Sequence, residues 1–119
     1  MKYTEEHEWL RAENDVVVVG ITEHATEQLG DIVFVELPEI GTVVAKDDEV
    51  VVIESVKAAS DILAPIDGEI VEVNAALGDN PALANDDATG EGWFFKIKPS
   101  DPSQMDSMMD ADAYKAFIA

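Results

Sequence analysis

The residue best suited to chemistry is Lys57, which lies between two runs of strand-forming residues. Val50–Ile53 on one side is apolar and β-branched, and Asp61–Ala64 on the other precedes a proline, which favours extended backbone before it. Two such runs separated by a few small residues predict a β-hairpin with Lys57 near its tip. Lys57 is the only basic residue between Lys46 and Lys96. We interpret its amine as an exposed attachment point for a covalent cofactor.

A lysine at a turn is more commonly a solvated residue that discourages strand pairing. The residues around Lys57 therefore have to indicate whether it carries a cofactor. Residues 54–61, Glu-Ser-Val-Lys-Ala-Ala-Ser-Asp, resemble the lipoylation motif of the glycine cleavage H-protein family. Lipoyl domains of 2-oxo acid dehydrogenases typically carry Asp-Lys-Ala and biotin carriers Met-Lys-Met, and this chain has neither. The resemblance implies that lipoate is attached covalently to Lys57. It implies further cofactor-binding positions at Glu54, Ser55, Val56 and Ala58.

Five other motifs resemble the same family and occur in its order along the chain. They are His7-Glu8-Trp9, Gly20-Ile21-Thr22, Gln28-Leu29-Gly30-Asp31, Val33 to Pro38 and Gly90 to Trp93. With the lysine motif they cover nearly the whole chain, which implies one lipoyl-carrier domain over residues 1–119. Two segments depart from the family pattern: the turn at 46–48 lacks the usual glycine, and the loop at 84–89 is unusually acidic. Both lie away from Lys57, so they concern loop geometry rather than function.

The segments that must position these motifs have mainly the pattern of β-strands. Strands are predicted from apolar or alternating runs at residues 7–10, 16–19, 32–37 and 93–98. The alternation predicts two groups that each share one face, namely Val33, Val35 and Leu37, and Trp93, Phe95 and Ile97. The whole of 41–79 is also predicted to be β, and 80–92 to be loop. A faint similarity between 41–44 and 68–71 suits two quasi-symmetric β units.

Two helices complete the predicted fold. Thr22 can cap a short helix over 23–29 that ends at Gly30, and Asp110 can cap a C-terminal helix. The methionines at 105, 108 and 109 are interpreted as core residues rather than as a cofactor site. With the resemblance, this pattern implies the flattened barrel of lipoyl and biotinyl domains, a barrel-sandwich hybrid. The short helix then follows the second strand, and the other helix lies at the C-terminus.

The composition is strongly acidic and excludes several function classes. Twenty-six acidic residues against seven basic ones give a net charge of −19. This charge repels nucleic acid and anionic membranes, and it steers the chain toward basic patches on partner proteins, although adaptation to a salty environment would produce it too. The chain has no cysteine, its first six residues are acidic and lack the apolar core expected of a signal peptide, and its longest apolar run is too short to span a bilayer. We expect a cytoplasmic protein.

No other constellation in the chain predicts a reaction centre. The two histidines, His7 and His24, and the absence of cysteine do not predict a metal site. We interpret His24 as a solvated helix residue and His7 as a residue that orders the N-terminal strand. Residues 85–87 lack the spacing of a calcium loop, and there is no phosphate loop or nucleophile elbow. The chain is therefore predicted to be a carrier and not an enzyme.

The resemblance implies how such a carrier works. The lipoyl arm accepts an aminomethyl group as glycine decarboxylase (the P protein) acts on glycine, and it delivers this group to the tetrahydrofolate-dependent aminomethyltransferase (the T protein). Dihydrolipoyl dehydrogenase (the L protein) reoxidises the arm, and a lipoate ligase or lipoyl transferase attaches it. The family motifs also imply that Glu8 and Asp61 contact the loaded arm. Two alternatives stay open: an H-like reservoir of lipoate or octanoate, and an acidic non-enzymatic protein that binds a basic partner by charge alone.

Overall fold

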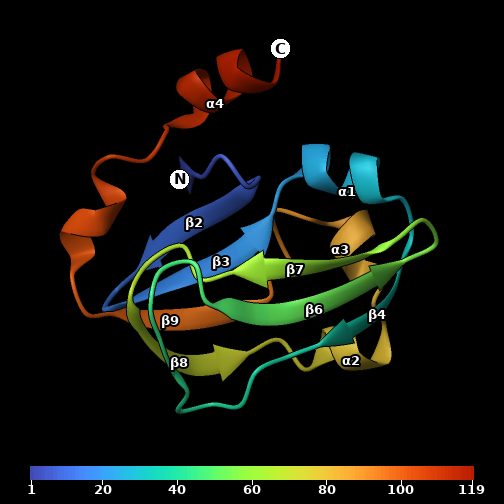
Figure 1. Cartoon of the computed structure of the whole chain (residues 1–119), viewed down its shortest axis with the longest axis horizontal. Coiled ribbons are helices and arrows are strands. Elements are labelled where there is room, and N and C mark those ends of the chain that lie inside the picture. The colour runs from blue at the N-terminus through green and yellow to red at the C-terminus, as the bar shows by residue number, and fades with distance from the viewer.

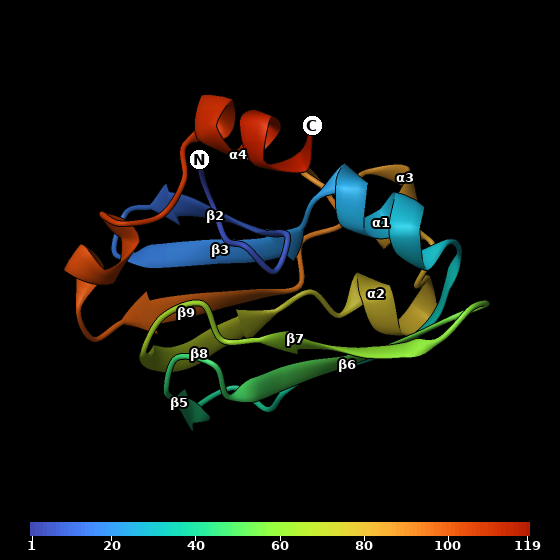
Figure 2. The ribbon, with the colours of Figure 1, turned by 45° about the horizontal axis from the view of Figure 1, so that its top comes forward.

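The structure, a computed structural model that describes residues 1–119, consists mainly of two antiparallel sheets arranged as two layers (Figures 1 and 2). The six-stranded sheet has the spatial order β1 (Lys2–Tyr3), β2 (Glu8–Glu13), β3 (Val16–Ile21), β9 (Phe95–Pro99), β8 (Gly68–Val73) and β5 (Val43–Val44). The three-stranded sheet has the order β4 (Ile32–Glu36), β6 (Glu49–Ser55) and β7 (Ala59–Leu63). The predicted mainly β fold, a barrel-sandwich hybrid, is confirmed.

The helices are short and lie outside the two layers. They are α1 (Glu23–Leu29), α2 (Ala76–Asp79), α3 (Leu83–Asp86), the 3₁₀ helix η1 (Pro102–Met105) and α4 (Ala111–Ile118). None of them is both long and apolar enough to cross a membrane. The two predicted helices are confirmed as α1 and α4. Thr22 caps α1 by accepting a hydrogen bond from the Ala25 amide at 3.3 Å, and Asp110 accepts one from Ala113 at 2.8 Å to cap α4.

The core is formed by alternate side chains that point inward from both sheets. It contains Val51 and Ile53 of β6, Ile62 of β7, and facing residues that include Leu10, Val19, Phe95 and Ile97. Trp9 is also fully buried but lies on the other face of β2 from Leu10, because neighbouring strand residues point to opposite faces. Its indole N–H donates to the carbonyl of Ala88 at 2.9 Å, and its ring covers Gly20 on β3. A Cβ at Gly20 would lie 2.6 Å from that ring, so only glycine fits there.

Strand β4 corrects one prediction. Its pairing with β6 shifts register between Ile32 and Phe34, which marks a bulge. Val35 is buried, but both Val33 and Phe34 are exposed, by 55% and 45%. The prediction that Val33 shares a face with Val35 and Leu37 is therefore wrong, because the bulge breaks the alternation at Val33.

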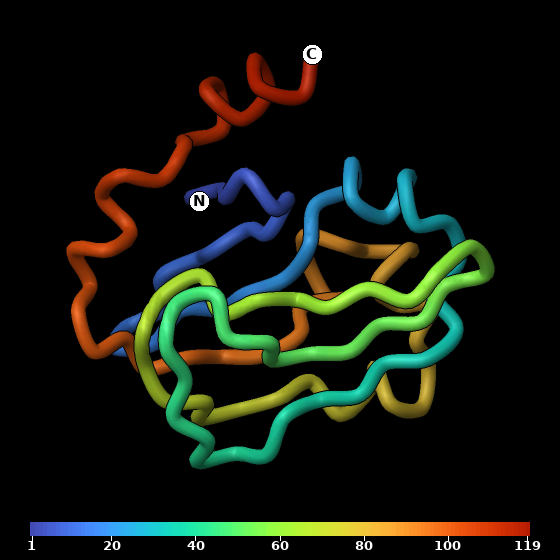
Figure 3. The backbone as a smooth tube through the Cα atoms, viewed as in Figure 1, coloured from blue at the N-terminus to red at the C-terminus, as the bar shows by residue number.

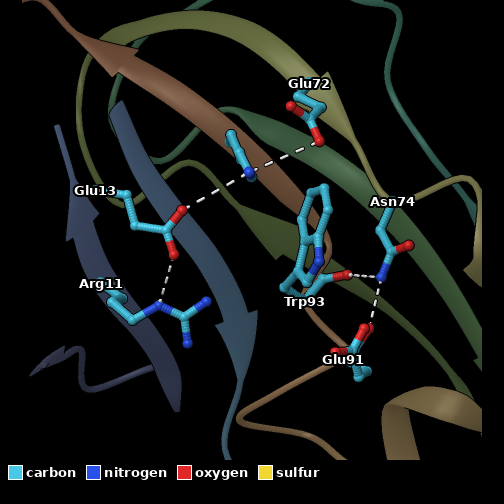
Figure 4. Close-up of polar contacts among 7 residues, drawn as sticks. Arg11, Glu13, Glu72, Asn74, Glu91 and Trp93 are labelled. Atoms are coloured by element: carbon cyan, nitrogen blue, oxygen red, sulfur yellow. Dashed lines mark hydrogen bonds and ion pairs between the residues drawn. The ribbon is translucent and has the colours of Figure 1, made fainter. Parts of the chain in front are cut away.

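Trp93 corrects a second prediction. Strand β9 begins only at Phe95, and Phe95 and Ile97 are buried as predicted. Trp93 precedes the strand and packs against the Lys96 ammonium, which is 5.1 Å from the ring centroid, so it does not share their face. Figure 4 shows how Asn74 holds this segment: its side-chain NH₂ donates to the carbonyl oxygens of Glu91 at 2.7 Å and Trp93 at 2.8 Å.

Two further predictions are wrong in part. The region 41–79, predicted as β throughout, ends in helix α2, and the predicted loop 80–92 contains helix α3. Each helix has four residues and no side-chain hydrogen bond at its N-cap. Neither the helical spacing nor the capping residues that identify longer helices are therefore present in the sequence.

The C-terminal segment leaves the six-stranded sheet after β9 and runs back to the N-terminus (Figure 3). Met105 and Met108 pack against the core, in agreement with their interpretation as core residues, whereas Met109 is half-buried outside the core and pairs through its backbone with Tyr3. Tyr114 is the only buried residue of α4. Its ring stacks on Tyr3 with centroids 4.7 Å apart, and its hydroxyl bonds the Thr22 hydroxyl at 2.7 Å. It also bonds Nδ1 of His7 at 2.8 Å. Tyr114 is therefore the main contact between α4 and the body, and Phe117 adds a second contact with its ring centroid 6.0 Å from that of His7.

Candidate functional site

Lys57 lies at the tip of the β6–β7 hairpin, which projects from the body beside α1 (Figure 2). The turn is built by Ser55 and Ala58. The Ser55 amide and hydroxyl both donate to the Ala58 carbonyl at 2.9 Å, and the Ser55 oxygen accepts from the amides of Lys57 at 3.3 Å and Ala58 at 3.1 Å. The predicted hairpin is confirmed. Ser55 and Ala58, predicted as cofactor-binding positions, shape the turn that presents Lys57.

The tip is fastened to the connection between α1 and β4. The Val56 amide donates to the carbonyl of Asp31 at 3.0 Å, and the aliphatic stem of Lys57 lies against Gly30. A Cβ at Gly30 would lie 3.4 Å from Lys57 Cε, and the φ of +75° at this position also favours glycine. Since 3.4 Å is an ordinary van der Waals distance, the backbone conformation at Gly30, and not a lack of space against the tip, favours glycine at this position.

Asn85 holds that connection from the other side and was not anticipated as a site residue. Its side-chain oxygen accepts from the Ile32 amide at 2.9 Å, and its NH₂ donates to the carbonyl of Gly30 at 2.8 Å. These bonds fix the backbone on both sides of Asp31, which receives the bond from Val56. No pattern in the sequence indicates this role for Asn85.

The Lys57 amine is exposed and forms no ion pair. The ion pairs of the structure lie elsewhere, between Arg11 and Glu13 and between Lys96 and both Glu13 and Glu72 (Figure 4). Glu54 is exposed on β6, where it lies opposite Ala59 and Phe34 in the neighbouring strands. No group of three His, Asp or Glu side chains is placed to hold a metal ion. The amine is therefore available to an incoming acyl group.

A cavity of about 410 Å³ opens between β7 and the end of α1, next to the base of the tip. The structure brings the two predicted arm contacts, Glu8 and Asp61, into its lining. Asp61 is exposed and lies at the rim, because it points away from the core face that Ile62 occupies. Gln28 and Ser60, which belong to family motifs but were not predicted to be site residues, also line this cavity.

Glu8 is the buried acid of the cavity wall, with 4% of its surface exposed. Its carboxylate accepts hydrogen bonds from the Thr4 hydroxyl and the Leu63 amide, each at 3.1 Å, and so connects β2 with the end of β7. Burial raises the pKa of Glu8 to about 7, and the negative charges of Glu6 and Asp47 also raise it. The two hydrogen bonds lower the pKa but do not offset this rise. A carboxyl group in this environment would gain strongly from a nearby cation.

Comparison with known proteins assigns the chain to a family. The sequence model of the family described as glycine cleavage H-protein matches residues 1–119. The chain belongs to the glycine cleavage H-protein family. It is 59% identical to the glycine cleavage system H protein of Shewanella oneidensis over 119 residues, which cover 99% of this chain and 92% of that protein.

Other H proteins agree in sequence and in structure. The chain is 58% identical to the glycine cleavage system H protein of Shewanella putrefaciens, with the same coverage. It superposes on the crystal structure of a glycine cleavage system H protein from Mycobacterium marinum with a TM-score of 0.88 and 40% identity, covering 98% of this chain and 94% of that one. The family predicted from the sequence motifs is confirmed.

Proposed function

We propose that this chain is the lipoyl-carrying shuttle of the glycine cleavage system, with lipoate attached through an amide to Lys57. The observation that carries the proposal is an exposed amine without an ion pair, fixed at a hairpin tip in a member of the H-protein family. Residues 1–119 act together as one carrier domain. The chain contributes no reaction centre of its own.

Lys57 fits the chemistry of attachment. A lipoate ligase or lipoyl transferase presents an activated acyl group, and the deprotonated amine attacks its carbonyl carbon. The C–N bond of the amide forms as the bond from the carbonyl carbon to the leaving group breaks. The two protons lost by the ammonium pass to the enzyme and to water. Because no carboxylate is within ion-pair distance of Lys57, no partner has to be displaced when its charge is lost.

Lipoate bound to Lys57 would supply a dithiolane able to carry an aminomethyl group between glycine decarboxylase and the aminomethyltransferase, with dihydrolipoyl dehydrogenase to restore its oxidised form. The residues of this chain position and shelter that load. Glu8 lies buried in the cavity next to the tip, where its carboxylate can pair with a primary ammonium, an interaction worth roughly 1.5–3 kcal/mol when shielded. Asp61 at the rim meets the same ammonium on entry.

Replacement of Lys57 by arginine tests the proposal. Arginine keeps the positive charge on an exposed tip, so the free energy of unfolding should change by no more than about 0.5 kcal/mol. The guanidinium does not form the amide, so the variant should gain no lipoyl mass and support no glycine decarboxylation. The measurements are intact mass after incubation with a lipoate ligase, and release of carbon dioxide from glycine by reconstituted partners.

The same measurements separate the alternatives. A lipoate or octanoate reservoir would be acylated at Lys57 but would support transfer of the acyl group to other proteins rather than glycine decarboxylation. A protein that binds basic partners by its charge alone would remain unmodified and would tolerate Lys57→Arg. Wild-type decarboxylation by the variant would contradict the shuttle function.

A further inference from the structure

Three exposed apolar side chains lie beside Lys57 and have no role in the core. Val33 and Phe34 are turned out by the bulge in β4, and Val56 at the hairpin tip is 65% exposed. We call these three residues the tip patch. They are neighbours in space, because Phe34 pairs with Glu54, Ile32 pairs with Ser55, and the Val56 amide bonds the carbonyl of Asp31. The patch is continuous with Lys57, since the Val56 and Lys57 side chains both lie against Gly30.

The rim of the tip patch is acidic. Asp31 precedes β4, Glu36 ends it, and Glu54 lies directly opposite Phe34 on β6. All three are exposed, and none of them forms an ion pair. A partner that covers this surface would therefore present an apolar centre surrounded by lysine or arginine side chains.

The position of the patch selects one class of partner. An enzyme that acylates Lys57 must bring its reaction centre to the amine itself, so its surface has to cover the hairpin tip. Enzymes that act on the far end of a long flexible arm do not have to contact the tip. We propose that the tip patch is the docking surface for the enzyme that acylates Lys57, and that this enzyme meets it with an apolar face rimmed by basic residues. The inference rests on the proposed attachment at Lys57.

The chain provides a matched control at another site. Ile40 and Val43 are exposed by 64% and 76%, at least as much as Val33 and Phe34. Ile40 precedes β5 and Val43 lies in it. Strand β5 belongs to the six-stranded sheet, whereas the tip patch belongs to the three-stranded sheet. In Figure 1 this segment and the hairpin tip lie at opposite ends of the molecule. The same polar substitutions can therefore be compared near Lys57 and far from it.

The experiment measures acylation of the apo chain by a purified bacterial lipoate–protein ligase with lipoate and ATP, followed by intact mass at several chain concentrations. The double variant Val33→Ser, Phe34→Ser is expected to raise the KM of the ligase for the chain at least about tenfold, which corresponds to about 1.4 kcal/mol, because apolar anchors at the centre of an interface carry most of its binding energy. The double variant Ile40→Ser, Val43→Ser should leave the KM unchanged. Val56→Ser provides a single substitution in the patch in case the double variant folds poorly.

A chemical probe separates docking from damage to the tip. Acetylation of Lys57 by a small N-hydroxysuccinimide ester requires no docking, so its rate at Lys57 should be equal in the wild type and both double variants. A KM that is unchanged by all patch substitutions would overturn the inference while the proposed function stands. A KM that rises together with slower chemical acetylation would also overturn it, because the substitutions would then have altered the tip itself.

Two further results would contradict the inference. If the ligase does not acylate the wild-type chain at Lys57, both the proposed function and this inference fail. If the wild-type chain sediments as a dimer that the patch substitutions dissociate, the patch belongs to a second copy of the chain and not to the ligase.

Discussion

Glu8 shows how one buried side chain links the site to the stability of the fold. Its pKa of about 7 lies above the value of 4.5 that it has when exposed, mainly because burial disfavours the charged form. Between these two values the folded chain binds more protons than the unfolded chain, so the free energy of unfolding falls as the pH rises. The contribution of Glu8 is complete below pH 4.5 and is lost as the pH rises through about 7, and its size is about 3 kcal/mol.

Glu8→Gln should remove this dependence, because glutamine keeps an acceptor for the Leu63 amide and does not ionise. We expect the wild type to lose about 2–3 kcal/mol more than the variant between pH 5 and pH 8, measured by urea unfolding, because part of the change lies below pH 5. Asp61→Asn is the control, since Asp61 is exposed. If the free energy of unfolding changes with pH equally in the wild type and in Glu8→Gln, the pKa of Glu8 is not raised in the folded state.

The same side chain should determine how long the carrier keeps its glycine-derived load. Glu8→Gln removes the anionic partner of the ammonium, so the load should decay faster, by about tenfold or more if a shielded charge-assisted hydrogen bond is lost. Asp61→Asn, at the exposed rim, should have a smaller effect. The decay is followed after removal of the decarboxylase. Equal lifetimes in the wild type and both variants would exclude the proposed pairing, whereas lipoate attachment should be unchanged in all three.

At the scale of secondary-structure elements, Asn85 makes α3 a clamp on the segment that receives the hairpin tip. Asn85→Ala leaves the amide of the buried Ile32 without its acceptor, which should lower the free energy of unfolding by about 1–3 kcal/mol. The tip should loosen as well, so trypsin should cleave after Lys57 faster. Asp86→Ala, an exposed neighbour on the same helix, should change neither quantity. A variant whose stability and cleavage rate match the wild type would contradict the clamp.

The elements also show how far the sequence leads. The hairpin, α1 and α4 follow from local signals, namely strand-forming runs around small residues and caps at Thr22 and Asp110. The bulge in β4 does not, because residues 32–35 are all apolar and carry no local sign of it, and the register shift arises from the pairing of β4 with β6.

In the candidate site, the motif around Lys57 predicted an exposed lysine at a hairpin tip, which the structure contains, but it did not predict the clamp formed by Asn85. Asn85 reaches partners 53 and 55 positions away in the sequence, and no local pattern reports such a contact. The burial of Glu8 likewise depends on β7 lying near β2, which brings the Leu63 amide to its carboxylate. The motifs therefore predicted candidate site residues, whereas the burial and the hydrogen bonds of these residues can be described only from the folded chain.

For the whole molecule, the dominant property is its charge of −19 on a body with a radius of gyration of 13.2 Å. Such a field should steer the chain toward basic surfaces, and salt should weaken this effect because it screens charges beyond about 8 Å at physiological ionic strength. We expect the Michaelis constant of the decarboxylase for this chain to rise with salt. If the acidity instead reflects a salty environment, the Michaelis constant stays flat and the free energy of unfolding rises with salt.

The attachment of α4 mainly through Tyr114 has a consequence for hydrogen exchange. Undocking α4 exposes little apolar surface, so its amides should exchange through local opening, at a lower free energy than the amides of β3 and β9 within the six-stranded sheet. The Tyr114 hydroxyl also bonds Thr22, whose side chain caps α1 by accepting from the Ala25 amide. The Ala25 amide is therefore expected to lose its protection from hydrogen exchange together with α4. Helix α1, which borders the cavity, would then open with α4 as one cooperative unit.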